Sequence, residues 1–387
     1  MITVIADDLT GAAEIAGICL RYGLKTSFGI DEMPENVADI TIIATDSRSM
    51  TEEEAYKTHR QLADIVLAKK SNQLLFKKCD SVLRGYVLTE LAPLRDAAKK
   101  ECLLLQPANP AVNRCIVQGS YFINNELLEN TGFALDPDFP SSSSLVKNLL
   151  LERAGQHPKM DKIHTGIITE INSEGLFIPD CNTVEDLKKC VELYNEQTIL
   201  GGSAAFFEQV LVKHYPNLTE VKPKKYNFVD HYLLLSGSTQ PESIRFAANL
   251  KNNNCPVLVM PNNLLKKNIE ASHLTDWMKE TMQVYNENKK LVLRISDQII
   301  EFEGSSKILK NRMSNVVKQL LENTSINELF IEGGATAYDL LQKLNWKSFT
   351  PTAELTPGVV RMQYALDNTK YITLKPGSYK WPEGLLQ

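Results

Sequence analysis

The chain has 387 residues, of which 43% are hydrophobic and 23% are charged, and its formal net charge is -5. This length predicts two domains at about 150 residues per domain. The small negative charge gives no reason to expect nucleic acid or a membrane surface as a partner, although local basic residues could still bind a small anion.

No apolar run approaches the roughly 20 residues that a membrane-spanning helix needs. The first residues carry two aspartates and lack the basic region of a secretory signal. Seven cysteines are scattered without CxxC spacing, which predicts reduced thiols rather than a disulfide or metal framework. We therefore expect a cytoplasmic protein. The sequence identifies neither metal ligands nor the oligomeric state, so a homo-oligomer stays open.

The N-terminal half alternates short apolar segments with amphipathic ones, which is typical of a parallel sheet covered by helices. We expect strands over residues 2–6, 39–44, 73–77, 102–106, 163–168 and 198–202. Helices are predicted from Thr10 and Leu145, and over residues 51–69, 87–99 and 204–214. A β-hairpin is predicted over residues 116–128, with Asn124 and Asn125 as turn residues.

Residues 215–227 are rich in Pro, Lys and Asn, have no apolar periodicity, and form the best candidate for a linker. The second half repeats the alternation, with strands over 232–235, 256–260, 291–295, 328–331 and 371–374. Helices are predicted from Pro241, over 307–322, and after Gly333. The predicted fold class is α/β, with two domains (residues 1–220 and 228–387) that each contain a mostly parallel layered sheet.

Charged residues follow several of the predicted N-terminal strands, where open α/β sheets place their ligands. They are Asp7, Asp8, Asp46, Arg48, Lys78, Asp80 and Arg84. This mixture suits a small polyhydroxylated acid, because Arg and Lys bind a carboxylate and aspartates accept hydrogen bonds from hydroxyls. Two alternatives are structural: Asp8 could cap the following helix, and Asp80 could form a salt bridge with Arg84.

The C-terminal half contains four glycine-rich turns, and turns of this kind at helix starts offer free N–H groups to phosphates. They lie at residues 236–239, 332–337, 356–358 and 375–378. Neither a Walker-type P-loop nor the G-x-G-x-x-G dinucleotide fingerprint is present. The G-x-S-x-G and H-E-x-x-H motifs are also absent, which disfavours an acyl-transfer hydrolase or a zinc protease.

Several motifs together resemble the four-carbon acid sugar kinase family. In the N-terminal half they are IADDLTGAAEIAG, TDSRS, KKCDSVLRG and QPANPAVNRCIVQGSYFINNELL. In the C-terminal half they are LSGSTQ, EGGATA, LTPGVV and LKPGSY. The resemblance runs in order over essentially the whole chain. It implies an N-terminal domain that binds the sugar acid, a C-terminal domain that binds ATP, and an active site in the cleft between the domains.

The resemblance also implies roles for residues in the matching motifs. Asp7, Asp8, Arg48, Lys78, Asp80 and Arg84 fall on the substrate side. Ser236, Ser238, Gly333, Gly334, Ala335, Thr336, Ala337 and Gly377 fall on the nucleotide side. The chain departs from the family at Thr239–Gln240, where Cys-Ser is common, and at Ala335, where many members have an acidic residue; those roles do not transfer.

The expected reaction is transfer of the γ-phosphate of ATP, with Mg²⁺, to the 4-hydroxyl of threonate, erythronate or an oxo-tetronate. Asp8 is the first candidate to orient or deprotonate that hydroxyl, and Asp80 is the second. Arg84 is the candidate for the substrate carboxylate, and the N–H groups of Gly333, Gly334 and Gly377 for the phosphates. Two alternatives are a non-enzymatic two-domain sugar-acid binding protein and an NAD(P)-dependent sugar-acid dehydrogenase.

Overall fold

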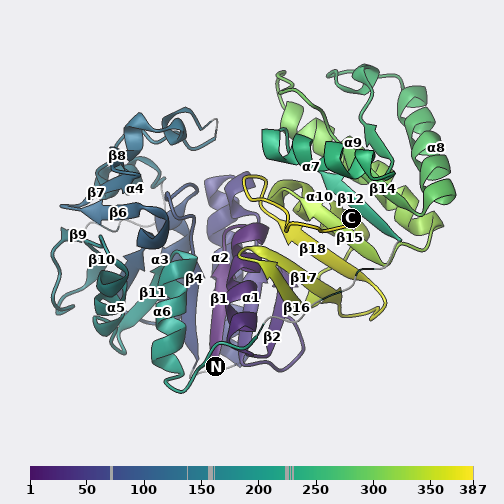
Figure 1. The fold of residues 1–387 in the computed structure, drawn as a ribbon. Helices are drawn as coiled ribbons and strands as arrows, with labels where there is room; N and C mark the ends of the chain where they lie inside the picture. Colours follow the sequence, from purple (N-terminus) through teal and green to yellow (C-terminus); the bar gives the residue numbers. More distant parts are fainter. Residues whose placement is uncertain are drawn as a thin grey trace. The chain divides into compact units, whose positions relative to one another are not determined.

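The structure is a computed structural model that describes residues 1–69, 73–136, 138–155, 160, 162–222, 226, 228 and 231–386. The chain divides into two compact units, Met1–Glu220 and Val221–Gln387. Positions 223–225 and 227 of the predicted linker lie outside the described residues. Each unit has its own mostly parallel sheet, which confirms the predicted α/β class (Figure 1).

The sheet of the first unit is parallel throughout the described residues. Its strands, in spatial order, are β2 (Thr26–Ile30), β3 (Ile40–Ala44), β1 (Ile2–Ala6), β4 (Leu74–Lys78), β11 (Thr198–Gly202), β5 (Cys102–Gln106), β10 (Gly175–Pro179) and β9 (Ile163–Gly166). The register pairs Ala6 with Ala44 and with Lys78. The residues that follow β1, β3 and β4 therefore meet at one edge of the sheet.

Six helices of the first unit are described: α1 (Leu9–Arg21), α2 (Glu52–Lys69), α3 (Val87–Ala97), α4 (Val146–Glu152), α5 (Val184–Glu192) and α6 (Ala204–His214). Helices α1 and α5 both pack against α6, and α2 packs against α3. Thr51 and Glu54 form a capping box at the start of α2, with Thr51 N donating to Glu54 Oε2 at 2.8 Å and Glu54 N to Thr51 Oγ1 at 3.3 Å.

The predicted hairpin is a small antiparallel sheet of three strands, β6 (Arg114–Val117), β7 (Ser120–Ile123) and β8 (Glu126–Leu127). Asn124 and Asn125 both have positive φ, at 50° and 66°, as a type I′ turn requires. The prediction missed a second tight turn at Gln118–Gly119, where φ is 51° and 71°. This sheet carries residues that contact the candidate site.

The second unit orders its strands as β13 (Val257–Val259), β14 (Lys290–Arg294), β12 (Tyr232–Ser236), β15 (Glu328–Glu332), β18 (Tyr371–Lys375), β17 (Val359–Tyr364) and β16 (Ser348–Thr356). All are parallel except β16 and β17, which form an antiparallel hairpin. Its helices are α7 (Pro241–Asn252), α8 (Ala271–Asn288), α9 (Ser305–Asn323) and α10 (Gly334–Leu344).

The β16–β17 hairpin corrects the expectation that residues 356–358 form a glycine-rich turn at the start of a helix. Residues 356–358 form the turn between β16 and β17, because Thr356 pairs with Val359 across it. Gly358 has a φ of +78°, and a Cβ there would lie 2.5 Å from the ring of Tyr379. This glycine therefore serves a strand turn rather than a helix start.

Candidate active site

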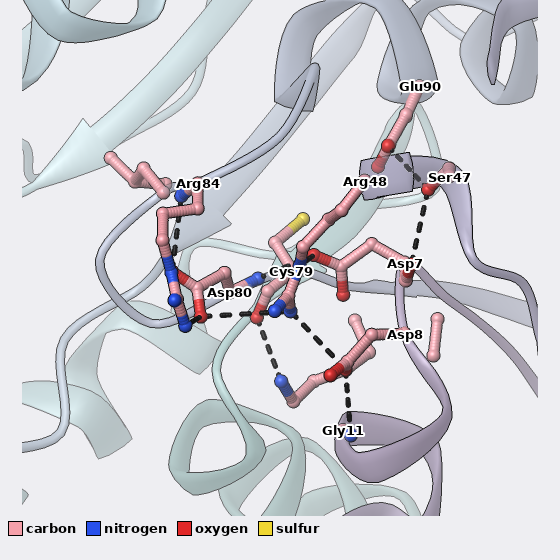
Figure 2. Close-up of polar contacts among 12 residues, drawn as sticks. Asp7, Asp8, Gly11, Ser47, Arg48, Cys79, Asp80, Arg84 and Glu90 are labelled. Carbon is pink, nitrogen blue, oxygen red and sulfur yellow. Dashed lines mark hydrogen bonds and ion pairs between the residues drawn. The ribbon is translucent and has the colours of Figure 1, made fainter. Parts of the chain in front are cut away.

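Arg48 connects the three aspartates at the carboxyl edge of the first sheet (Figure 2). It lies in a single 3-10 turn, Ser47–Ser49, directly after Asp46. Its Nε lies 2.7 Å from Asp7 Oδ2, and its Nη2 lies 3.3 Å from Asp8 Oδ1 and 3.7 Å from Asp80 Oδ1. The predicted convergence of strand-end residues is therefore present for these four side chains.

Asp7 is buried, with 1% of its side chain exposed, and also accepts a hydrogen bond from the Asp80 N–H at 3.1 Å. Burial raises the pKa of Asp7, but Arg48, Lys77 and Lys78 outweigh it and lower the pKa to about 2. Asp7 is thus a fixed carboxylate that holds Arg48. Its burial does not favour the predicted direct contact with substrate.

Asp8 caps α1, as the structural alternative proposed, because its Oδ1 accepts a hydrogen bond from Gly11 N at 2.8 Å. Its Oδ2 accepts a hydrogen bond from Thr10 Oγ1 at 2.6 Å. The side chain is 17% exposed, in contrast to the buried Asp7. Capping therefore leaves Asp8 accessible at the sheet edge.

Asp80 and Arg84 form the salt bridge that the sequence left open as an alternative. Arg84 Nε lies 3.0 Å from Asp80 Oδ2, and Arg84 Nη2 lies 3.0 Å from Asp80 Oδ1. The third guanidinium nitrogen of Arg84, Nη1, lies 3.3 Å from Asp136 Oδ2. Burial raises the pKa of Asp80, but Arg48 and Arg84 outweigh it and hold the pKa far below the ordinary value.

These contacts correct two expectations. Asp80 accepts further hydrogen bonds from the N–H groups of Val82 and Arg84, so both of its oxygens are occupied and its low pKa makes it a poor base. All three nitrogens of Arg84 contact carboxylates of the protein, which disfavours this residue as the one that binds the carboxylate of a substrate.

Lys78 ends β4 and is buried, at 4% exposure. Its Nζ donates to the carbonyl of Cys79 at 2.9 Å and forms no ion pair within the described residues. A Cβ placed on Gly11 would lie 3.0 Å from this Nζ and 2.5 Å from Asp8 Oδ1. Gly11 thus allows the ammonium group and the Asp8 carboxylate to approach the start of α1 closely.

A buried network behind this cluster was not predicted from the sequence. Lys77 Nζ lies 2.9 Å from Glu90 Oε2, and Ser47 Oγ lies 2.7 Å from Glu90 Oε1 and 3.3 Å from the carbonyl of Asp7. His59 packs against the same carboxylate, with its Nε2 3.9 Å from Glu90 Oε2. The only sequence signal was a glutamate among apolar residues in the predicted helix over 87–99.

Three loops of the second unit meet at the carboxyl edge of its sheet. They follow β12, β15 and β18, whose register aligns Ser236 with Glu332 and Glu332 with Lys375. A Cβ on Gly237 would lie 2.0 Å from Thr336 Oγ1, and one on Gly377 would lie 3.6 Å from Ser238 Oγ. Gly237 thus allows its loop to pack closely against the start of α10, whereas the contact at Gly377 would be an ordinary van der Waals one.

Helix α10 begins at this edge without a side-chain cap. The N–H groups of its first turn belong to Gly334, Ala335 and Thr336, which have no hydrogen-bond acceptor among the described residues. The Gly333 N–H instead donates to the carbonyl of Lys375 at 2.9 Å, so the expectation that it would face a phosphate does not hold. Ala337 N also donates internally, to the carbonyl of Gly333 at 3.0 Å.

A buried ion pair that the sequence did not reveal lies beside the predicted nucleotide-side serines: Ser236 contacts it directly, and Ser238 is linked to it through Ser243. Lys375 Nζ lies 2.7 Å from Glu332 Oε1, and each side chain is 1% exposed. Ser236 Oγ donates to Glu332 Oε2 at 2.7 Å, and Ser243 Oγ contacts Ser238 Oγ at 3.0 Å. The pair borders a cavity of about 690 Å³ between α7 and residues 379–384.

The described residues contain no group of three or more His, Cys, Asp or Glu side chains placed to hold a metal ion. They also contain no helix long and apolar enough to cross a membrane.

Comparisons with known proteins agree with this division of the chain. Residues 2–210 match the family model for a sugar-binding N-terminal domain, and residues 233–379 match the one for a nucleotide-binding C-terminal domain. A D-threonate kinase of Salmonella typhimurium is 21% identical over 383 residues, which cover 92% of this chain and 89% of that protein. The chain belongs to the four-carbon acid sugar kinase family.

Members of this family match over the whole length. A 3-oxo-tetronate kinase of Pseudomonas savastanoi pv. phaseolicola is 23% identical and aligns with 97% of this chain and 93% of its own. A solved structure of a Salmonella typhimurium LT2 protein, 19% identical, superposes with a TM-score of 0.73 over 98% of this chain and 96% of that one. The likeness to the solved structure concerns the fold alone. The names of the curated relatives, which are kinases, support a phosphotransferase.

Proposed function

We propose that the protein transfers the γ-phosphate of ATP to the 4-hydroxyl of a four-carbon sugar acid: threonate, erythronate or an oxo-tetronate. The observation that carries the proposal is the arrangement around Gly11. An accessible carboxylate, Asp8, and a buried ammonium with no carboxylate partner among the described residues, Lys78, lie together at the edge of the first sheet. Such a pair suits a substrate that carries both hydroxyls and negative charge.

Asp8 is the residue that we propose to orient or deprotonate the hydroxyl. Its side chain is 17% exposed, whereas that of Asp7 is 1% exposed and that of Asp80 is 9% exposed and held in a two-bond salt bridge by Arg84. Arg48 Nη2 lies 3.3 Å from Asp8 Oδ1 and holds this carboxylate in position at the sheet edge. Lys78 then attracts the negative charge of the substrate or of the phosphoryl group that it receives.

The second unit supports a role in binding nucleotide phosphates. The unpartnered N–H groups of Gly334, Ala335 and Thr336 form a helix N-terminus, which favours anions through both its donors and its dipole. Ser238 and Gly377 border the same edge. Ser236 is a weaker candidate for direct contact, because its hydroxyl proton is already donated to Glu332.

Phosphoryl transfer depends on positioning and on neutralising charge on the phosphoryl oxygens. Mg²⁺, when bound, would supply part of that neutralisation, and we propose that it enters with ATP and is coordinated through the phosphates.

An ADP-release assay across the D- and L-threonates, erythronates and oxo-tetronates tests this function. We expect one or a few of these acids to release ADP in the presence of Mg²⁺. ATP with Mg²⁺ should also raise the melting temperature of the protein. A sugar acid that stabilises the protein while ATP does not would favour a binding protein instead. Reduction of NAD(P)⁺ by a sugar acid would favour a dehydrogenase.

A further inference from the structure

The arginine side chains around residues 80–84 differ in the groups that they contact. Arg48 and Arg84 are paired with carboxylates of the protein. Arg153 donates to backbone carbonyls, including those of Phe139 at 2.9 Å and Pro140 at 3.0 Å, and so holds this region together. Each of these three guanidinium groups is therefore held by several contacts inside the protein.

Arg114 is different. It begins β6, is partly exposed, and has no carboxylate partner among the described residues. Its Nη1 contacts the hydroxyl Oγ of Ser81, the residue that directly follows Asp80 in the chain. The other nitrogens of Arg114 have no acceptor within the described part of the chain, and guanidinium presents five donors in all.

The surroundings fix Arg114 in place. Its backbone exchanges hydrogen bonds with Asn109, with Asn109 N donating at 2.8 Å and Arg114 N at 3.1 Å. The ring of Phe133 lies 5.9 Å from Arg114 Cζ and 5.6 Å from Arg84 Cζ. Tyr121, from the next strand, is fully buried and donates to the Ser81 carbonyl at 2.6 Å. Such a guanidinium is oriented before a ligand arrives, which lowers the entropy lost on binding.

We propose that Arg114 binds the carboxylate of the sugar acid and thereby makes the enzyme prefer acids over neutral polyols. This inference rests on the proposed function. It assigns recognition of the carboxylate to Arg114 instead of Arg84. A planar guanidinium with free nitrogens can bind both oxygens of a carboxylate, and charge-assisted pairs of this kind are the strong ones. The motif at residues 106–128 thereby gains a role in specificity.

The test compares steady-state kinetics of Arg114→Gln and of the unmodified protein, with the best sugar acid and with the tetritol of the same configuration. We expect Arg114→Gln to raise KM for the acid about 10- to 100-fold, to leave KM for ATP unchanged, and to affect the tetritol little. The preference for acid over tetritol should therefore collapse. Arg114→Lys should restore part of this preference, because lysine keeps the positive charge but lacks the planar guanidinium that binds both carboxylate oxygens.

Two further variants test whether Arg114 recognises the substrate or only supports the loop that contains Ser81. Ser81→Ala removes the hydroxyl that Arg114 contacts but keeps the guanidinium, so it should retain the preference for acids. Arg95→Gln, at a partly exposed arginine paired with Asp96, is the matched control for loss of charge.

Equal losses of activity toward acid and tetritol in Arg114→Gln, or a Ser81→Ala variant that behaves like it, would overturn the inference. A wild-type protein that phosphorylates no sugar acid would instead overturn the proposed function.

Discussion

Arg48 Nε and Asp7 Oδ2 lie 2.7 Å apart, so the buried carboxylate that ends β1 fixes the guanidinium that also contacts Asp8 and Asp80. This pair explains how adjacent aspartates have different roles. Asp7 is removed from solvent and holds Arg48, whereas Asp8 stays at the surface of the site.

Asp8→Asn should lower kcat by roughly 10²- to 10⁴-fold, or about 3–5 kcal/mol in transition-state free energy. Asparagine caps helices about as well as aspartate, so the fold should be unaffected and the melting temperature nearly unchanged. The measurement is kcat at saturating sugar acid and ATP. Full retention of kcat would remove Asp8 from the chemical step.

Gly11→Ala should impair the site without removing any functional group. The added Cβ would meet Asp8 Oδ1 at 2.5 Å and Lys78 Nζ at 3.0 Å, so both groups must shift. A displacement of about 1 Å can cost up to 10²-fold in rate. The matched control is Gly132→Ala, whose Cβ meets nothing within 4 Å. Indistinguishable kcat/KM values for the two variants would contradict the arrangement around Gly11.

Gly237→Ala should weaken the use of ATP rather than of the sugar acid. Its Cβ would lie 2.0 Å from Thr336 Oγ1 and would displace the first turn of α10. We expect kcat/KM for ATP to fall about 10- to 100-fold. Adding Thr336→Ala should restore part of the loss, since it removes the clashing oxygen. A change confined to KM for the sugar acid would contradict the assignment of this edge to phosphates.

Glu332→Gln should destabilise the protein by about 3–5 kcal/mol, because it leaves the Lys375 ammonium buried without its counter-charge. Burial already lowers the pKa of Lys375, and Glu332 opposes that effect. The double variant Glu332→Gln/Lys375→Met should be less destabilised than the single one. Urea denaturation of the full chain measures both, and additive losses would show that the two residues are not coupled.

His59 should make stability depend on pH on the acid side. Burial, and then Lys77, lower the pKa of His59 from 6.5 to about 4. Below pH 6.5 the unfolded chain therefore binds more protons than the folded one, and stability falls progressively until pH 4. Between pH 7.5 and 5 this amounts to about 2 kcal/mol.

The His59→Gln variant should lose that part of the pH dependence, while the same change at the exposed His231 should not. Urea midpoints at the two pH values provide the measurement. Identical pH dependence in His59→Gln and the unmodified protein would show that His59 is not held neutral.

Strong local patterns predicted the fold well. The strand over 102–106 and the helix over 204–214 are confirmed with their predicted bounds, because each is a compact apolar run or a well-capped amphipathic segment. Elements with weak patterns were missed. Strand β2 contains Gly29 and β10 ends in Pro179, and α8 buries only Trp277, Thr281 and Tyr285 along one stripe.

The candidate site was predictable in position, but of its pairings only the Asp80–Arg84 salt bridge and the Asp8 cap were foreseen, and only as alternatives. The rule that ligands bind at the carboxyl ends of parallel strands located Asp7, Asp8, Arg48, Lys78 and Asp80. Which groups neutralise one another depends on strand register and side-chain direction. The alignment of Glu332 with Lys375 across β15 and β18 is one such feature, and the pairing of Arg84 with Asp136 from a distant loop is another.

Transfer of ³²P from [γ-³²P]ATP to the four-carbon acids is the decisive measurement of the proposed kinase activity. We expect a labelled sugar acid phosphorylated on its 4-hydroxyl, formed by the unmodified protein with Mg²⁺ and reduced at least 10²-fold in Asp8→Asn. Label that appears only in inorganic phosphate, or in no acid of the panel, would contradict it.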